Sequence, residues 1–237
     1  DLSVSSLWLG HEEEFNNLEL FQFKISQLQN KFPNSVLAGG YMEPRALYTS
    51  PAYDKIGNSG RESRTVHLGI DFWLPGQTPV HAILEGEVVV ASHSDEYKGY
   101  GGLVILKHQV ENFTFFTLYG HLSAASVKMY TSGDLVEKGE KIGELGSPDE
   151  NGNCVPHLHF QVTLSLLDYQ NDFPGVTYHN QIEVWQSICP DPNLLFKSEA
   201  LRDTGETSNA ELIKYREQHL GKSLSLHYNK PIKKVRG

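Results

Sequence analysis

Apolar residues follow two different periods along this chain of 237 residues. The first pattern runs from about residue 11 to 32, where apolar side chains recur at steps of three and four: Phe15, Leu18, Phe21, Ile25, Leu28 and Phe32. This spacing predicts an amphipathic helix that stops before Pro33. From residue 64 to 165, short apolar runs alternate with glycine turns, which predicts an antiparallel β domain.

The segments on either side of the β domain have weaker patterns. Residues 36–60 and 166–200 are expected to be rich in loops, and residues 208–220 are expected to form a short linking helix. We therefore divide the chain into an N-terminal extension (1–60), a β domain (61–165) and a C-terminal extension (166–237). The apolar face of the first helix is too broad to stay in water, so we expect the extensions to pack on the β domain or on a neighbouring chain.

Composition narrows the classes of partner. The formal charge of −9 argues against nucleic acid and against an anionic membrane or wall polymer as an electrostatic partner. No apolar run reaches eighteen residues, so no membrane span is predicted. Two cysteines are too few for a disulfide scaffold and favour a reducing compartment. Cys154, close to His157, is interpreted as a small buried hydrophobic residue.

Five residues of metal-binding type lie in three short motifs. His67 and Asp71 are four residues apart, His121 follows a β-rich run, and His157 and His159 are two apart. Even spacings on extended segments put side chains on one face, so three strands can direct these groups into one groove. A single histidine is most often an ordinary surface or core residue, but this ordered set fits a zinc hydrolase, which needs three ligands and proton-transfer groups.

The motifs resemble those of the M23 zinc peptidases. The resemblance runs from about Arg64 to Val162 and rests on the strings His67–Phe72, Tyr119–Ser123, Pro156–Phe160, Pro79–Val89, Gly99–Leu106 and Gly133–Gly143. It implies a mainly β fold, an antiparallel sheet or sandwich of the LytM-like (duplicated hybrid motif) type with peripheral helices. His81 departs from the family pattern, and we interpret it as a strand histidine rather than a substrate contact.

The same resemblance implies the roles of the site residues. His67, Asp71 and His159 would bind Zn²⁺, while His121 and His157 would be the catalytic pair acting on a peptide or muropeptide. Without the glutamate of an HExxH motif, proton transfer would fall to these two histidines, and which one is the base stays open. Arg64, Arg45 and Tyr41 are possible additional donors, although a loop-fixing hydrogen bond is the favoured interpretation for each.

Shorter strings near both ends resemble one M23 subgroup, in which the domain lies between a phosphotransferase-like kinase domain and a class III aminotransferase. The strings include Gly40–Arg45 and Cys189–Asn193. We therefore expect a piece of a longer, cytoplasmic polypeptide, or a periplasmic or secreted one if a signal peptide precedes it. The alternative function is a non-catalytic zinc- or ligand-binding module within such a protein.

Overall fold

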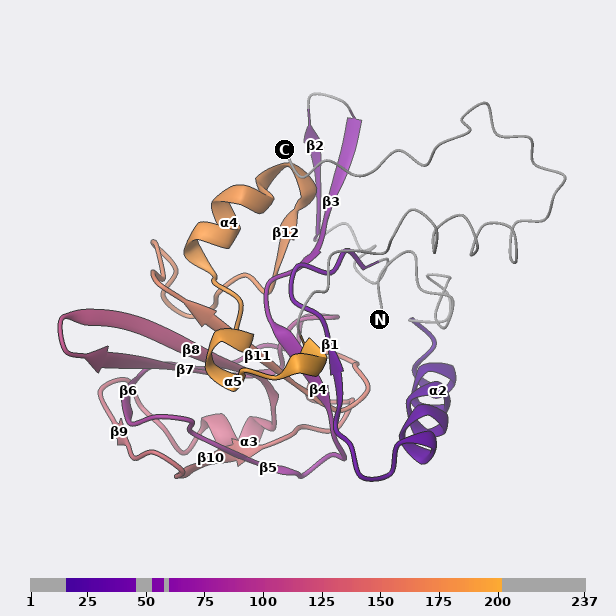
Figure 1. The fold of residues 1–237 in the computed structure, drawn as a ribbon, viewed down its shortest axis with the longest axis horizontal. Helices are drawn as coiled ribbons and strands as arrows, with labels where there is room; N and C mark the ends of the chain where they lie inside the picture. The colour runs from indigo at the N-terminus through magenta and orange to yellow at the C-terminus, as the bar shows by residue number, and fades with distance from the viewer. Residues whose placement is uncertain (1–15, 46–52, 58–59, 202–237) are drawn as a thin grey trace, which may run out of the picture. The chain divides into compact units, whose positions relative to one another are not determined.

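The structure is a computed structural model that describes residues 16–45, 53–57 and 60–201 (Figure 1). Its helices are α2 (Leu18–Lys31), α3 (Ala124–Val127), α4 (Ile182–Ile188) and α5 (Asn193–Phe196), with 3-10 turns η2 (His179–Gln181) and η3 (Glu199–Leu201). Its strands are β1 (Leu37–Gly39), β2 (Asp54–Gly57), β3 (Gly60–His67), β4 (Ile70–Trp73), β5 (Pro79–His81), β6 (Gly86–His93), β7 (Gly102–Val110), β8 (Phe113–Leu122), β9 (Leu135–Val136), β10 (Lys141–Glu144), β11 (His157–Thr163) and β12 (Val176–Tyr178).

A seven-stranded antiparallel sheet forms the centre of the fold. Its strand order is β1-β4-β11-β8-β7-β6-β9, and the strands β2, β3 and β12 form a smaller sheet beside it. In the large sheet, β11 lies between β4 and β8, and His159 is opposite Asp71 on one side and Gly120 on the other. This register brings all three metal-type motifs to one region of the sheet.

Both faces of the large sheet are covered, as the alternation along β7 shows. Val104 and Leu106 face a core that includes residues of β5, β10 and α3, whereas Leu103 and Ile105 face a second core with Phe173. Successive strand residues point to opposite faces, so a strand buried on both sides is continuously apolar. The expected mainly β, antiparallel architecture with peripheral helices is confirmed.

The N-terminal helix packs on the sheet through a narrow apolar stripe. Asn17 caps α2 by accepting a hydrogen bond from the backbone N–H of Leu20 at 3.0 Å. Phe21 and Ile25 are buried against Trp73 of β4. The predicted helix began at about residue 11, but residues 11–15 lie outside the described residues, and α2 begins at Leu18 because Asn17 takes the capping position.

The C-terminal extension is more regular than the sequence analysis expected. Trp185 lies in α4, not in a loop, and its ring meets the edge of Phe173 at a centroid distance of 6.0 Å. Trp185 and Ile188 are three residues apart, so both face the same core. The helix expected at 208–220 lies outside the described residues.

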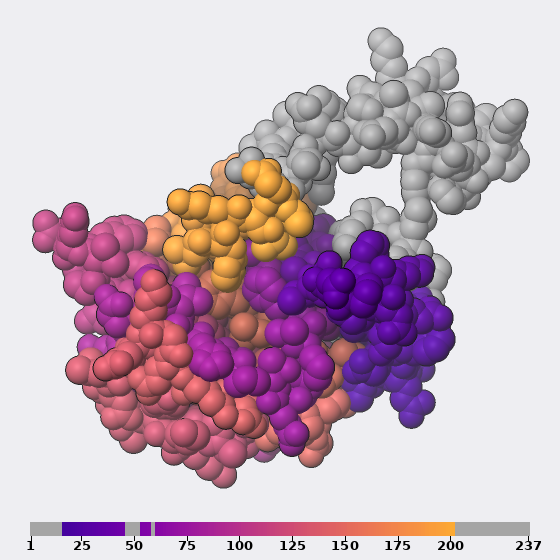
Figure 2. All heavy atoms as spheres, turned by 60° about the horizontal axis from the view of Figure 1, so that its bottom comes forward, coloured from indigo at the N-terminus to yellow at the C-terminus, as the bar shows by residue number. Residues whose placement is uncertain are grey.

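Both extensions meet the β domain directly. β1 pairs with β4, and β12 pairs with β3. Figure 2 shows the indigo N-terminal segment and the orange C-terminal segment as parts of the surface around the magenta strands. Within the described part of the chain, no helix combines the length and apolar character needed to cross a membrane.

Candidate metal centre

Three side chains converge at the ends of neighbouring strands. His67 closes β3, Asp71 lies in β4 and His159 lies in β11. The segment from His67 to Asp71 is not one extended strand, because Leu68 and Gly69 separate β3 from β4. Gly69 has to be a glycine here, since a Cβ would lie 2.6 Å from the Phe160 carbonyl oxygen and 2.7 Å from His159 Nε2.

The three ligand-type atoms form a compact triangle. His67 Nε2 lies 2.9 Å from His159 Nδ1 and 3.2 Å from Asp71 Oδ1, and His159 Nδ1 lies 3.1 Å from Asp71 Oδ1. Ligand atoms about 2.0–2.1 Å from a tetrahedral zinc ion are roughly 3.4 Å apart. Two imidazole nitrogens and one carboxylate oxygen at these separations therefore fit a zinc ion, and this is the group of metal-ligand type found among the described residues.

Outer hydrogen bonds fix the orientation of both histidine ligands. His67 donates its Nδ1–H to the Gly40 carbonyl at 3.1 Å, so its Nε2 is left to face the metal. His159 donates its Nε2–H to Gln161 Oε1 at 3.0 Å, which leaves Nδ1 for the metal. These assignments follow because carbonyl oxygens can only accept. Such partners set the tautomer of a metal-binding histidine.

The carboxylate ligand also has an outer partner. Asp71 Oδ2 accepts a hydrogen bond from Arg45 Nη1 at 2.5 Å, while Oδ1 faces the two histidines. Burial by itself would raise the pKa of Asp71, but His67 and Arg45 outweigh it and hold that pKa well below its usual range. Asp71 is therefore ionised, as a carboxylate that binds a metal must be.

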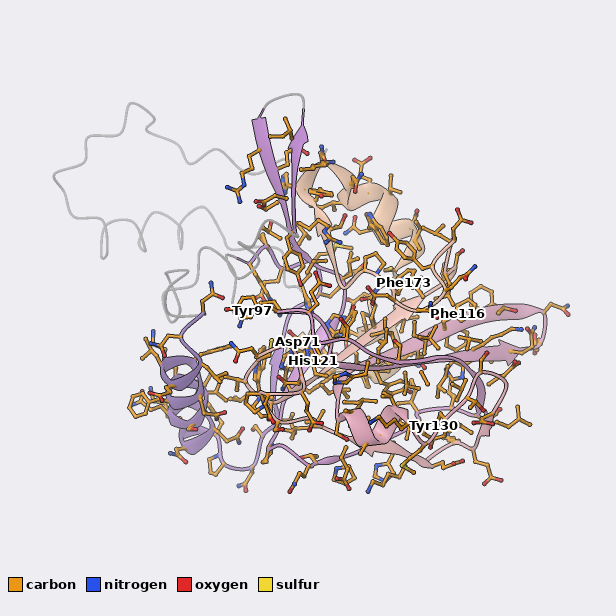
Figure 3. The ribbon with its side chains drawn as sticks, turned by 180° about the vertical axis from the view of Figure 1, so that it is seen from behind. Asp71, Tyr97, Phe116, His121, Tyr130 and Phe173 are labelled. Carbon is orange, nitrogen blue, oxygen red and sulfur yellow. The ribbon has the colours of Figure 1, made fainter. Side chains whose placement is uncertain are left out.

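His121 and His157 lie beside the triangle, as Figure 3 shows for His121 and Asp71. Their ring centroids are 4.1 Å apart, and His157 Nε2 lies 3.8 Å from Asp71 Oδ1. His121 donates Nδ1–H to the Asn151 carbonyl at 2.9 Å, and His157 donates Nδ1–H to the Val155 carbonyl at 2.7 Å. Each Nε2 is therefore unprotonated in the neutral ring and can accept a proton.

The environment keeps this pair of histidines neutral. Burial lowers the pKa of His157 and holds the pKa of His121 well below its usual range. His121 also has a positive φ of 63°, a left-handed conformation that non-glycine residues seldom adopt. Its backbone is held there because its N–H donates to the Tyr100 carbonyl and its carbonyl accepts from the N–H of Gly146.

A cavity of about 310 Å³ opens beside these residues. His121, His159 and Tyr100 line one side of it, and the segment Phe173–Val176 of the C-terminal extension lines another. Arg64 is among the charged residues that line it, with its guanidinium 5.1 Å from the ring centroid of Tyr53. The cavity is large enough for a residue or two of a peptide.

The remaining candidates from the sequence lie outside the triangle. Tyr41 donates its hydroxyl to the Cys189 carbonyl at 2.5 Å and so joins the two extensions. Cys154 is buried, and burial raises the pKa of its thiol to about 11. His81 is exposed on β5. Gln161 is not among the residues predicted from the sequence, although it lies two residues after His159 on the same face of β11 and the spacing was a usable signal.

Comparisons with known proteins match part of this chain to peptidases. Residues 65–171 match the model of peptidase family M23. Over 154 residues the chain is 30% identical to lysostaphin of Staphylococcus staphylolyticus, covering 60% of this chain and 30% of lysostaphin. It is 37% identical over 95 residues to the glycyl-glycine endopeptidase ALE-1 of Staphylococcus capitis, covering 40% of this chain and 24% of that protein.

Among solved structures, the catalytic domain of lysostaphin from Staphylococcus simulans aligns with 71% of this chain and 97% of its own, at 26% identity and a TM-score of 0.43. The chain spans less than a third of the length of the curated relatives named above. The family match covers β4 to β11, the strands that carry Asp71, His121 and the two histidines of β11. Residues 65–171 of this chain, which include all five metal-type residues, are therefore similar to peptidase family M23.

Proposed function

We propose that this chain is a zinc-dependent peptidase that hydrolyses a peptide bond in peptidoglycan-derived peptides. The observation that carries the proposal is the triangle of His67 Nε2, Asp71 Oδ1 and His159 Nδ1, with two further neutral histidines beside it. A zinc ion held there would supply Lewis acidity toward a peptide carbonyl and toward water. Lysostaphin and a glycyl-glycine endopeptidase among the relatives support the class of substrate.

The side chains of this chain would manage the protons. His121 and His157 each expose an Nε2 that can accept a proton, because backbone carbonyls hold the opposite ring nitrogen as a donor. One of them would take a proton from the attacking water and pass it to the leaving amine, and the other would be able to donate to the developing oxyanion only in its protonated form. A metal-binding module without catalysis would not need this second pair, so the geometry favours the enzyme.

The cavity supports a restricted substrate. Its wall at Phe173–Val176 belongs to the C-terminal extension and lies beside His159, since a Cβ at Gly175 would come within 3.4 Å of His159 Cε1. A groove bounded this closely favours soluble muropeptides or short peptides over cross-linked wall.

Two measurements test the function. Purified protein should contain one zinc ion per chain, and His159→Ala should lose most of it, because two ligands seldom hold zinc tightly. Release of new amino groups should be followed on short glycine- and alanine-containing peptides, on soluble muropeptides and on intact wall. Rapid turnover of cross-linked wall with none of short peptides would contradict the restricted groove, and zinc-loaded protein inactive on all three would contradict the peptidase.

We also propose that the domain works within a longer cytoplasmic polypeptide that includes a phosphotransferase-like kinase and a class III aminotransferase. The resemblance of Gly40–Arg45 and Cys189–Asn193 to that subgroup supports this arrangement. The intact mass and subcellular fraction of the protein in its source cells would test it. A product of this length alone, or an exported one, would contradict it.

A further inference from the structure

Arg45 lies outside the segment that matches the M23 family, yet it is buried against a metal-type ligand. It is 1% exposed, and its side chain connects two carboxylates. Nη1 donates to Asp71 Oδ2 at 2.5 Å, and Nε donates to Glu43 Oε2 at 2.9 Å. A guanidinium has a rigid fork of donors, so these two contacts fix its plane as well as its position.

The backbone around Arg45 is held against the strand that carries His67. The N–H of Arg45 donates to the Thr65 carbonyl at 2.8 Å, and the N–H of His67 donates to the Glu43 carbonyl at 3.0 Å. Gly40, in the same segment, accepts the Nδ1–H of His67. Residues 40–45 therefore supply outer partners to two of the three metal-type ligands.

The space for the guanidinium depends on a glycine. A Cβ at Gly39 would lie 2.7 Å from Arg45 Nη2 and 2.6 Å from Trp73 Cη2. Real Cβ atoms do not come this close, and the buried guanidinium and the indole edge have little room to move. The glycine at position 39 of β1 therefore leaves the space that the Arg45 guanidinium occupies.

The two oxygens of Asp71 have different surroundings. Oδ1 lies 3.1–3.2 Å from the ligand nitrogens of His159 and His67, whereas Oδ2 is occupied by Arg45. We propose that Arg45 is a positioning residue that restricts Asp71 to one-oxygen metal binding and so preserves an open position for water and substrate. The inference rests on the zinc site of the proposed function.

The restriction follows from charge and geometry. Without Arg45, Asp71 Oδ2 would lose its cationic hydrogen-bond donor. Asp71 could then bind a metal ion through both carboxylate oxygens, as carboxylates can. A second bound oxygen would raise the coordination number and occupy the position that catalysis needs. Glu43 completes the arrangement by anchoring the other edge of the guanidinium.

Cobalt(II) substitution tests this, because the visible absorption of Co²⁺ is stronger in four-coordinate than in five- or six-coordinate sites. The full chain would be stripped of metal, titrated with Co²⁺ and compared with Arg45→Gln and Arg45→Lys. We expect one Co²⁺ per chain in each protein. The visible absorption band of the bound Co²⁺ should be weaker in Arg45→Gln than in the unchanged protein, and its intensity should be partly recovered in Arg45→Lys. With saturating zinc, kcat of Arg45→Gln should fall about 10- to 100-fold.

Two controls separate positioning from general stability. Arg61→Gln makes the same chemical change at an exposed ion pair with Asp54 and should leave the Co²⁺ band unchanged. Gly39→Ala keeps every charge but displaces Arg45, so its band should weaken as in Arg45→Gln. A lower Tm with an unaltered band per bound metal in Arg45→Gln would overturn the proposal. Failure of the unchanged protein to bind Co²⁺ or zinc would instead overturn the proposed function.

Discussion

At the scale of single residues, the five metal-type side chains divide into two groups by position: three form the triangle of ligand-type atoms, and His121 and His157 lie beside it. We predict that His121→Ala and His157→Ala keep their zinc but lose about two to four orders of magnitude in kcat, since each removes a proton-transfer or oxyanion group and no ligand. Metal analysis and kinetics on one substrate would check this. The exposed His179→Ala is the matched control, and loss of zinc from either site variant would mean that the division is wrong.

His108, which lies away from the metal-type residues, should make the stability of the folded chain depend on pH. His108 is 1% exposed, and burial lowers its pKa. Its Nδ1–H donates to the Glu85 carbonyl at 2.7 Å. Below a pH of about 6.5 the unfolded chain binds a proton that the folded chain excludes, so stability falls as pH falls. The slope from this residue is at most about 1.4 kcal/mol per pH unit.

The variant His108→Gln should show a smaller loss of stability between pH values of about 8 and about 5.5 than the unchanged protein. Urea unfolding at both values measures the difference, and the exposed His179→Gln is the control. Equal losses in the unchanged protein and in His108→Gln would assign the pH dependence to other groups.

At the scale of elements, α2 supports the region around His157 from one side. Ile25 is buried on Trp73, and the Trp73 ring stacks on His157 at 5.9 Å with an interplanar angle of 24°. We predict that Ile25→Ala weakens the docking of α2 by about 2 kcal/mol, at the low end for such truncations because the helix lies at the surface. Hydrogen exchange of the α2 amides should become faster in Ile25→Ala. Phe23 is 57% exposed, so Phe23→Ala should leave the exchange rates unchanged.

At the scale of the whole molecule, metal binding and folding should be linked. The ligand atoms belong to β3, β4 and β11, so they come within about 3 Å of one another only in the folded chain. We predict that chelation lowers Tm and that added zinc restores it. When free zinc exceeds its Kd a thousandfold, binding should raise the free energy of unfolding by about 4 kcal/mol. His159→Ala should show no such shift. An unchanged Tm after complete removal of metal would contradict the linkage.

The sequence by itself predicted the antiparallel β domain, the amphipathic N-terminal helix and the five metal-type residues, because strand and helix periods and short motifs are local properties. It could not show that Arg45 binds Asp71, which is 26 residues away, or that Gly40 and Gln161 orient the histidines. Those pairings depend on the register of β4, β11 and β8 and on the path of residues 40–45 beside β3. Only the tertiary structure decides which distant polar groups meet, because burial leaves each of them few possible partners.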